Sequence, residues 1–128
     1  MPDYDSTNVF ARILRGEIPN ATVAETEHTL AFDDITPQAP HHVLVIPKGA
    51  YTDYADFHGR ASAEEIADFH RTAARICRER GIDATGFRAI ANAGSHAVQD
   101  VPHFHLHLIG GRPLGRMLAP AVGSGGRA

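Results

Sequence analysis

The sequence predicts an α+β fold in which a five-stranded antiparallel sheet packs with two helices. Three observations lead to this fold class: five short apolar segments with strand character, two amphipathic helical segments, and short links between neighbouring strands. Short links favour antiparallel pairing, because a parallel connection needs a crossover of a dozen or more residues. The chain has 128 residues, which suits one domain with a sizeable core.

The first predicted helix spans residues 5–16. Ser6 or Thr7 can cap its amino end, because a side-chain oxygen there accepts an unpaired amide hydrogen of the first turn. Gly16 can end the helix, and Pro19 prevents its continuation because proline lacks an amide hydrogen. The apolar residues of this segment share one helical face: Val9, Phe10, Ile13 and Leu14.

Three strand segments follow, with a rigid loop between the second and the third. The strands are predicted at residues 21–27, 29–34 and 42–48, and the last is β-branched and apolar, as expected of a well-buried strand. Residues 35–42 contain two prolines and are predicted to form the loop. Residues 49–59 are predicted to form a second loop before the next helix.

The longer helix begins after Ser62 and is the clearest element of the chain. Ser62 and Glu65 have the spacing of a capping box, in which each side chain accepts a backbone amide hydrogen of the other residue. Gly81 marks the carboxyl end of this helix. Two further strands are predicted at residues 86–94 and 103–109. The apolar residues of the helix fall on one face: Ile66, Phe69, Ala73, Ile76 and Cys77.

Composition and charge exclude several classes of protein. The formal net charge is −3 and no Lys/Arg block stands out, so no nucleic-acid footprint is expected. No apolar run approaches the ~20 residues needed to cross a bilayer, and the start of the chain is not a secretory signal. The single cysteine, Cys77, excludes an internal disulfide and fits a reducing compartment. We therefore expect a cytoplasmic protein that binds neither nucleic acid nor membrane.

The chain is expected to contain one domain and a tail. Residues 1–115 are predicted to form the domain, since no internal repeat and no second core is visible. After Gly111 the sequence becomes rich in Gly, Pro and Ala. Residues 116–128 are therefore predicted to form a flexible C-terminal tail.

The segment VPHFHLHLIGG, residues 101–111, carries three histidines at a spacing of two residues. In a strand, alternate side chains point to opposite faces, so His103, His105 and His107 share one side and the apolar residues between them share the other. A helix would scatter the three imidazoles. We expect the apolar side to pack on the core, which leaves the imidazole side free for chemistry.

Three interpretations of the imidazole face compete. It can be the polar face of a half-exposed strand. It can bind zinc, although three histidines in register span ~13 Å, which is awkward for one tetrahedral ion. It can act on phosphate, because a neutral imidazole is a good nucleophile near pH 7 and protonated neighbours can bind phosphate oxygens. The third interpretation is the one that we favour.

Three blocks of the sequence resemble the histidine triad family, in the branch of nucleotide-binding phosphoramidases. They are NVFARILRGEIP, LAFDDITPQAPHHVLVIPK and NAGSHAVQDVPHFHLHLIGGRPLG, which occur in the same order as in that family. The resemblance covers roughly residues 8–115. It implies a five-stranded antiparallel sheet with two helices, and a homodimer that pairs through the long helix and a sheet edge.

The resemblance also implies a role for each of four histidines. His105 matches the nucleophile that attacks the α-phosphorus and becomes nucleotidylated. His103 and His107 match the flanking members that contact phosphate, and His42 matches a supporting histidine behind the triad. A nucleophilic imidazole must keep one ring nitrogen free, so the other nitrogen of His105 should donate to an acceptor such as a backbone carbonyl.

Further residues match the nucleotide pocket of the family. Asp34 matches the acceptor of ribose hydroxyl groups, although an aspartate at that position can simply belong to a turn. Asn92 matches a phosphate-side amide or is a loop former, and Val98, Gln99 and Asp100 match the turn along the phosphate. The purine pocket is matched by five apolar residues, of which the first three can equally be plain core: Val9, Phe10, Ile13, Phe32 and Ile35.

The sequence departs from the family pattern at Asp100, where many phosphoramidases carry a serine hydroxyl near the leaving group. A carboxylate there repels a substrate phosphate, so it either turns away or changes the leaving-group preference. The turn SHAV, residues 95–98, lacks the glycines that are common there.

These residues predict a purine nucleoside 5′-phosphoramidate hydrolase that acts through a nucleotidyl-histidine and needs no cofactor. The expected ligand is a purine nucleotide such as an adenosine monophosphate conjugate, with zinc possible but not required. The alternatives are a dinucleoside polyphosphate hydrolase, a nucleotidyl transferase and a nucleotide sensor without enzymatic activity. The choice between adenine and guanine stays open, because an apolar slot discriminates little between them.

Overall fold

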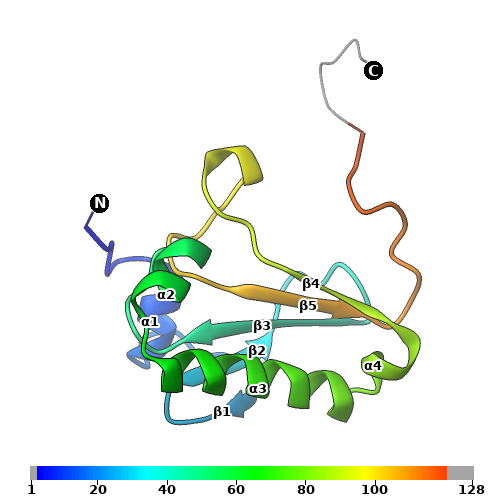
Figure 1. Cartoon of the computed structure of the whole chain (residues 1–128), viewed down its shortest axis with the longest axis horizontal. Helices are drawn as coiled ribbons and strands as arrows, with labels where there is room; N and C mark the ends of the chain where they lie inside the picture. Colours follow the sequence, from blue (N-terminus) through cyan, green and yellow to red (C-terminus); the bar gives the residue numbers. More distant parts are fainter. Residues whose placement is uncertain (1–2, 121–128) are drawn as a thin grey trace.

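The computed structural model describes residues 3–120 and forms a five-stranded antiparallel sheet with helices on both faces (Figure 1). The strand order is β1-β2-β3-β5-β4, so the last strand of the chain lies between the third and the fourth. The helices and the strands, in chain order, are α1 Val9–Leu14, β1 Thr22–Glu25, β2 Thr29–Asp33, β3 His41–Pro47, α2 Tyr54–Arg60, α3 Ala63–Glu79, α4 Ile82–Thr85, β4 Phe87–Ile90, the 3₁₀ turn η1 Ser95–Ala97 and β5 Leu106–Gly110.

The central strand β3 separates two apolar clusters, because its side chains alternate between the two faces of the sheet. Val43 and Val45 point to the face covered by α2 and α3, where they pack with Phe57 and Phe69. The other face carries Phe10 of α1 together with Leu30, Phe32, Leu44 and Ile46. Figure 1 shows α3 running along the sheet as the longest helix of the fold. Both faces of β3 are thus covered, which explains its continuous apolar run.

The predicted fold class and the five strands are confirmed, and the capping box of α3 is present. Glu65 N–H donates to Ser62 Oγ at 3.1 Å, and Ser62 N–H donates to Glu65 Oε1 at 2.9 Å. The predicted number of helices is wrong, because the described residues contain four α-helices rather than two. The additional two, α2 and α4, are short. None of the described helices is long and apolar enough to cross a membrane.

Helix α2 lies in the segment that was predicted to be a loop. Asp53 caps it by accepting the Asp56 amide hydrogen at 2.9 Å, and Phe57 anchors it in the core with no exposed surface. The cap was visible in the sequence, but a helix of seven residues carries too few apolar residues to show a helical period. The cap of α1 also differs from the prediction: Asn8, rather than Ser6 or Thr7, accepts the Ala11 amide hydrogen at 2.9 Å.

Strand β5 begins three residues later than predicted. The amide of Phe104 donates to the Tyr51 carbonyl at 2.7 Å and not to a neighbouring strand. His103 and His105 consequently precede the regular ladder, and His107 lies within it, opposite Leu44 of β3. Beyond β5, residues 116–120 contain no helix or strand. The remainder of the predicted tail lies outside the described residues.

Candidate active site

The imidazole side of β5 faces a pocket of about 320 Å³ beneath α1. The walls come from α1, the segment 18–21, the end of β2, the middle of β3, and the start of β5 with the residues before it. A hollow of about 570 Å³ at the β4 edge is larger but is lined by no histidine. The smaller pocket is lined by Val9, Phe10, Ile13, Ile18, Pro19, Asn20, Ala21, Phe32, Asp33, Asp34, Ile35, Leu44, Asp100, Val101, His105 and His107.

His105 presents one free ring nitrogen to this pocket. Its Nδ1–H donates to the backbone carbonyl of His103 at 2.8 Å, which fixes the tautomer and leaves the lone pair on Nε2. The side chain is 3% exposed, and the edge of the Phe10 ring packs against it with ring centroids 5.0 Å apart. The acceptor that a nucleophilic imidazole requires is therefore supplied by its own segment of the chain.

His103 lies behind the site, with both of its ring nitrogens engaged. Its Nε2–H donates to the Pro47 carbonyl at 2.9 Å, and its Nδ1 accepts the Tyr4 hydroxyl hydrogen at 2.5 Å. Asn8 Nδ2 donates in turn to the Tyr4 oxygen at 2.9 Å. The expectation that His103 contacts phosphate is wrong, because the side chain is 1% exposed and no ring atom is left for a ligand. Its backbone carbonyl, which orients His105, is the part that serves the site.

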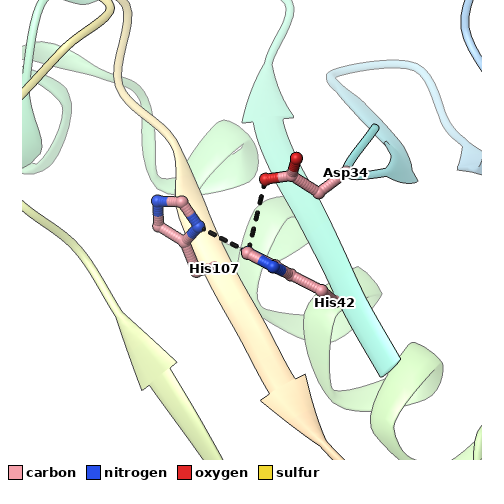
Figure 2. A group of neighbouring side chains, drawn as sticks. All are labelled: Asp34, His42 and His107. Carbon is pink, nitrogen blue, oxygen red and sulfur yellow. Dashed lines mark hydrogen bonds and ion pairs between the residues drawn. The ribbon is translucent and has the colours of Figure 1, made fainter. Parts of the chain in front are cut away.

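His107, His42 and Asp34 form a connected group beside the pocket (Figure 2). The amide of Gln38 donates to His42 Nδ1 at 3.1 Å, so His42 carries its hydrogen on Nε2. That hydrogen is directed to His107 Nδ1 at 2.8 Å, with Asp34 Oδ2 at 3.4 Å from the same nitrogen. His107 Nδ1 must then be an acceptor, which places the hydrogen of His107 on Nε2.

The flanking histidines are neutral rather than cationic. Burial lowers the pKa of His107 to about 4, and the neighbouring His105 and His42 act in the same direction. Burial likewise lowers the pKa of His103 to about 4, against the opposing effect of its hydrogen bond to Pro47. Near pH 7 His107 therefore offers a neutral N–H donor, and charge-assisted bonds from protonated neighbours to a phosphate stay a prediction.

Asp34 belongs to a turn and also lines the pocket, so both interpretations of this residue stay open. Its Oδ1 accepts the Thr36 amide hydrogen at 2.8 Å, which is turn chemistry, and the residue also lines the pocket. Ligand atoms of Asp34, His42 and His107 all lie within 4.8 Å of one another, so these three could hold a metal ion. This group differs from the zinc alternative considered for the triad, because it uses one triad histidine together with His42 and Asp34.

The loop before β5 brings one of its predicted residues into the pocket. Asp100 Oδ1 lies 3.8 Å from His105 Nε2, with 80% of the Asp100 side chain exposed. Gln99 instead braces the loop: its Nε2 donates to Thr52 and Val101 carbonyls at 2.8 and 3.0 Å, and its Oε1 accepts the Gly94 amide hydrogen at 3.0 Å.

Two other residues predicted to bind nucleotide lie away from the pocket walls. Val98 is 79% exposed and has the left-handed backbone angle φ of 57°. Asn92 is half-buried and does not line the pocket. The apolar residues predicted for the purine pocket all line it, and so do His105 and His107. His42 lies one step behind the pocket, through His107.

Sequence reasoning missed part of the pocket wall and the support behind it. Pro19 was interpreted only as a helix stop, although it and Ile18 line the pocket. Leu44 could have been assigned to the pocket from the sequence, because it points to the same face of β3 as His42. Tyr4 carried no signal, because its contact with His103 joins residues 99 positions apart.

The fold and the site together define a class of protein: a small antiparallel α+β domain that presents an oriented histidine to a nucleotide-sized pocket. Residues 15–114 match the family model of the HIT domain. The chain belongs to the HIT, or histidine triad, family.

Individual relatives agree with this family. A 13.2 kDa HIT-like protein from Azospirillum brasilense is 56% identical over 115 residues, which covers 90% of this chain and 94% of the relative. The purine nucleoside phosphoramidase of Escherichia coli K12 is 42% identical over 114 residues, which covers 87% and 92%. A histidine triad protein from Clostridium difficile has a similar structure, with a TM-score of 0.76, 38% identity and coverage of 91% and 98%.

Proposed function

We propose that this protein hydrolyses purine nucleoside 5′-phosphoramidates through a nucleotidyl intermediate on His105. One observation carries the proposal: His105 Nε2 has a free lone pair in the pocket, because Nδ1–H is fixed on the His103 carbonyl at 2.8 Å. The name of the Escherichia coli relative, purine nucleoside phosphoramidase, supports the substrate class.

The pocket accommodates the two halves of a nucleoside monophosphate. Its volume of about 320 Å³ and its apolar walls suit the purine, with Phe10 and Phe32 on one side. Asp34 Oδ2 is the acceptor for a ribose hydroxyl group. The phosphate then lies beside His105, where His107 Nε2–H donates to one of its oxygens.

The reaction proceeds in two steps. His105 Nε2 attacks phosphorus and the phosphorus–nitrogen bond breaks, so that the amine departs with the bonding electron pair and takes a proton. The imidazole ring gains positive charge in this step, and the His103 carbonyl stabilises it at Nδ1. Water then attacks phosphorus, restores His105 and releases the nucleoside monophosphate. This scheme requires no metal.

The same proposal includes a homodimer that acts in the cytoplasm. The resemblance to the phosphoramidase branch suggests pairing through the long helix, α3, and a sheet edge. We assign the β4 edge, where Phe87 is 40% exposed. The single, buried Cys77 is compatible with a reducing compartment. Light scattering coupled to gel filtration should give twice the mass of the 13.8 kDa chain.

The experiment that tests the function measures release of a fluorescent amine from its adenosine 5′-phosphoramidate. We expect turnover by the wild type and a loss of at least about a thousandfold by His105→Ala. His96 is exposed and does not line the pocket, so His96→Ala should leave turnover unchanged. Adenosine monophosphate should still bind to His105→Ala. Nucleotide binding without any turnover by the wild type would contradict the proposal and favour a sensor. Stoichiometric zinc with activity that chelators abolish would contradict the metal-free scheme.

A further inference from the structure

The pocket that faces His105 is acidic. Its lining contains three carboxylates, Asp33, Asp34 and Asp100, and within residues 3–120 it contains no Lys or Arg. A polyphosphate substrate usually meets basic side chains, because each additional phosphate adds negative charge that must be neutralised. This lining therefore matches a substrate with little negative charge beyond a single phosphate.

The three carboxylates differ in how their charge is compensated. Asp33 Oδ1 pairs with Arg80 Nη2 at 3.0 Å, so its charge is largely neutralised. Asp34 is held by the Thr36 amide at 2.8 Å and lies 3.4 Å from His42 Nε2. Asp100 forms no ion pair with a Lys or Arg of the described chain, and its nearest basic group is His105 Nε2 at 3.8 Å. Asp100 is the carboxylate whose charge remains available to a ligand.

The position of Asp100 relates its charge to the departing half of the substrate. The reacting phosphorus must come within about 3–3.5 Å of His105 Nε2, and the purine occupies the apolar end of the pocket. The leaving group lies on the side of phosphorus opposite the attacking nitrogen. It then points to the open mouth of the pocket, where Asp100 is 80% exposed. A cation on this group meets the carboxylate, whereas a further phosphate is repelled by it.

We propose that Asp100 forms a cation subsite for the leaving group, so that the preferred substrates are phosphoramidates of diamine-type amines. This inference rests on the proposed function and names its substrate class. In the transfer step, the His105–phosphorus bond forms and the phosphorus–nitrogen bond breaks. The departing nitrogen keeps the bonding pair and takes a proton from solvent at the mouth. The second amine, already an ammonium group, stays paired with Asp100 until release.

The test uses two matched adenosine 5′-phosphoramidates, one made from 1,3-diaminopropane and one from butylamine, which differ by an ammonium group in place of a methyl group. For the wild type we expect kcat/KM to be about tenfold higher with the cationic substrate, a difference of about 1.4 kcal/mol. Asp100→Asn should bring this ratio close to one. Asp83→Asn, which removes the same charge from an exposed position on α4, should leave the ratio unchanged. Added salt should lower the wild-type ratio, because exposed charges are screened.

Three results would overturn the proposal. A wild-type ratio near one would show that no cation subsite exists. An equal loss with both substrates in Asp100→Asn would assign the carboxylate to the chemical step instead of leaving-group selection. Preference of the wild type for diadenosine polyphosphates would contradict the repulsion argument. If neither phosphoramidate is hydrolysed and His105→Ala changes nothing, the proposed function itself fails, which the first two results do not imply.

Discussion

The two faces of the sheet receive alternate side chains of the same strands but have different contents. The face under α2 and α3 is a closed apolar core, with Phe57 and Phe69 fully buried. The face under α1 receives the histidines and is only partly filled, which leaves the pocket of about 320 Å³. A six-residue helix covers the second face and a seventeen-residue helix covers the first. The pocket is thus an unfilled part of the apolar face under the shorter helix.

An alternating strand can therefore pack in the core with one set of side chains and line the pocket with the other. Leu106 and Leu108 hold β5 in the closed core, while His107 between them reaches the pocket. The imidazole is therefore positioned by packing on the opposite face, which is rigid. Four predictions test this difference between the two faces of the sheet, from the largest expected effect to the smallest.

The largest effect should come from truncation in the closed core. Phe69→Ala leaves a cavity and should lower the free energy of unfolding by about 3–5 kcal/mol. Ile13→Ala, at the half-filled face, should lower it by about 1 kcal/mol and mainly raise KM. Urea titrations and steady-state kinetics of both variants measure the contrast. Similar losses of stability would show that the two faces contribute equally.

The histidine face should make the fold sensitive to acid. The pKa of His103 is lowered to about 4 in the folded chain, so the unfolded chain binds more protons between pH 4 and its ordinary value near 6.5. Stability therefore rises with pH across this window. From pH 7.5 to pH 5 the loss should be about 2 kcal/mol for His103, and His107 acts in the same direction. Urea titrations at several pH values measure it, and a flat profile between pH 7.5 and pH 5 would contradict it.

A smaller effect is expected from the polar support behind the triad. Tyr4→Phe removes the hydroxyl that donates to His103 Nδ1 and should lower the free energy of unfolding by about 1 kcal/mol. Nitrogen-15 spectra of the wild type should show hydrogen on Nδ1 of His105 and on Nε2 of His103 and His107. Finding the opposite tautomer of His105 would refute the free lone pair on Nε2.

The smallest effect concerns the loop that leads to the site. Val98 has a left-handed backbone, which is unfavourable for a β-branched residue, and it is 79% exposed. Val98→Asn should raise the free energy of unfolding by up to about 1 kcal/mol, because asparagine tolerates this conformation. Thermal unfolding of the variant checks the sign. A decrease would mean that the Val98 side chain makes a stabilising contact.

The sequence predicted the fold class because it follows from local patterns, whereas most of the pocket wall was predicted only from the resemblance to the histidine triad family. Alternation placed His105 and His107 on one face, and the capping box located the start of α3. The roles of His103 and Gln99 were not predictable, because their partners, Tyr4, Pro47 and Thr52, lie far away in the chain. Alternation gives the face of a side chain but not its burial, so His103 was expected at a surface that the N-terminal segment covers.

The place of β5 in the sheet has a consequence for synthesis of the chain on the ribosome. β4 is made before β5 but pairs with it, so β4 has no neighbour in the sheet until residues 106–110 emerge. His105 and the strand that joins the two parts of the sheet therefore appear at nearly the same moment. A nascent chain that stops before residue 105 lacks both this histidine and the most non-local strand pairing, so no folded fragment without His105 is expected to accumulate.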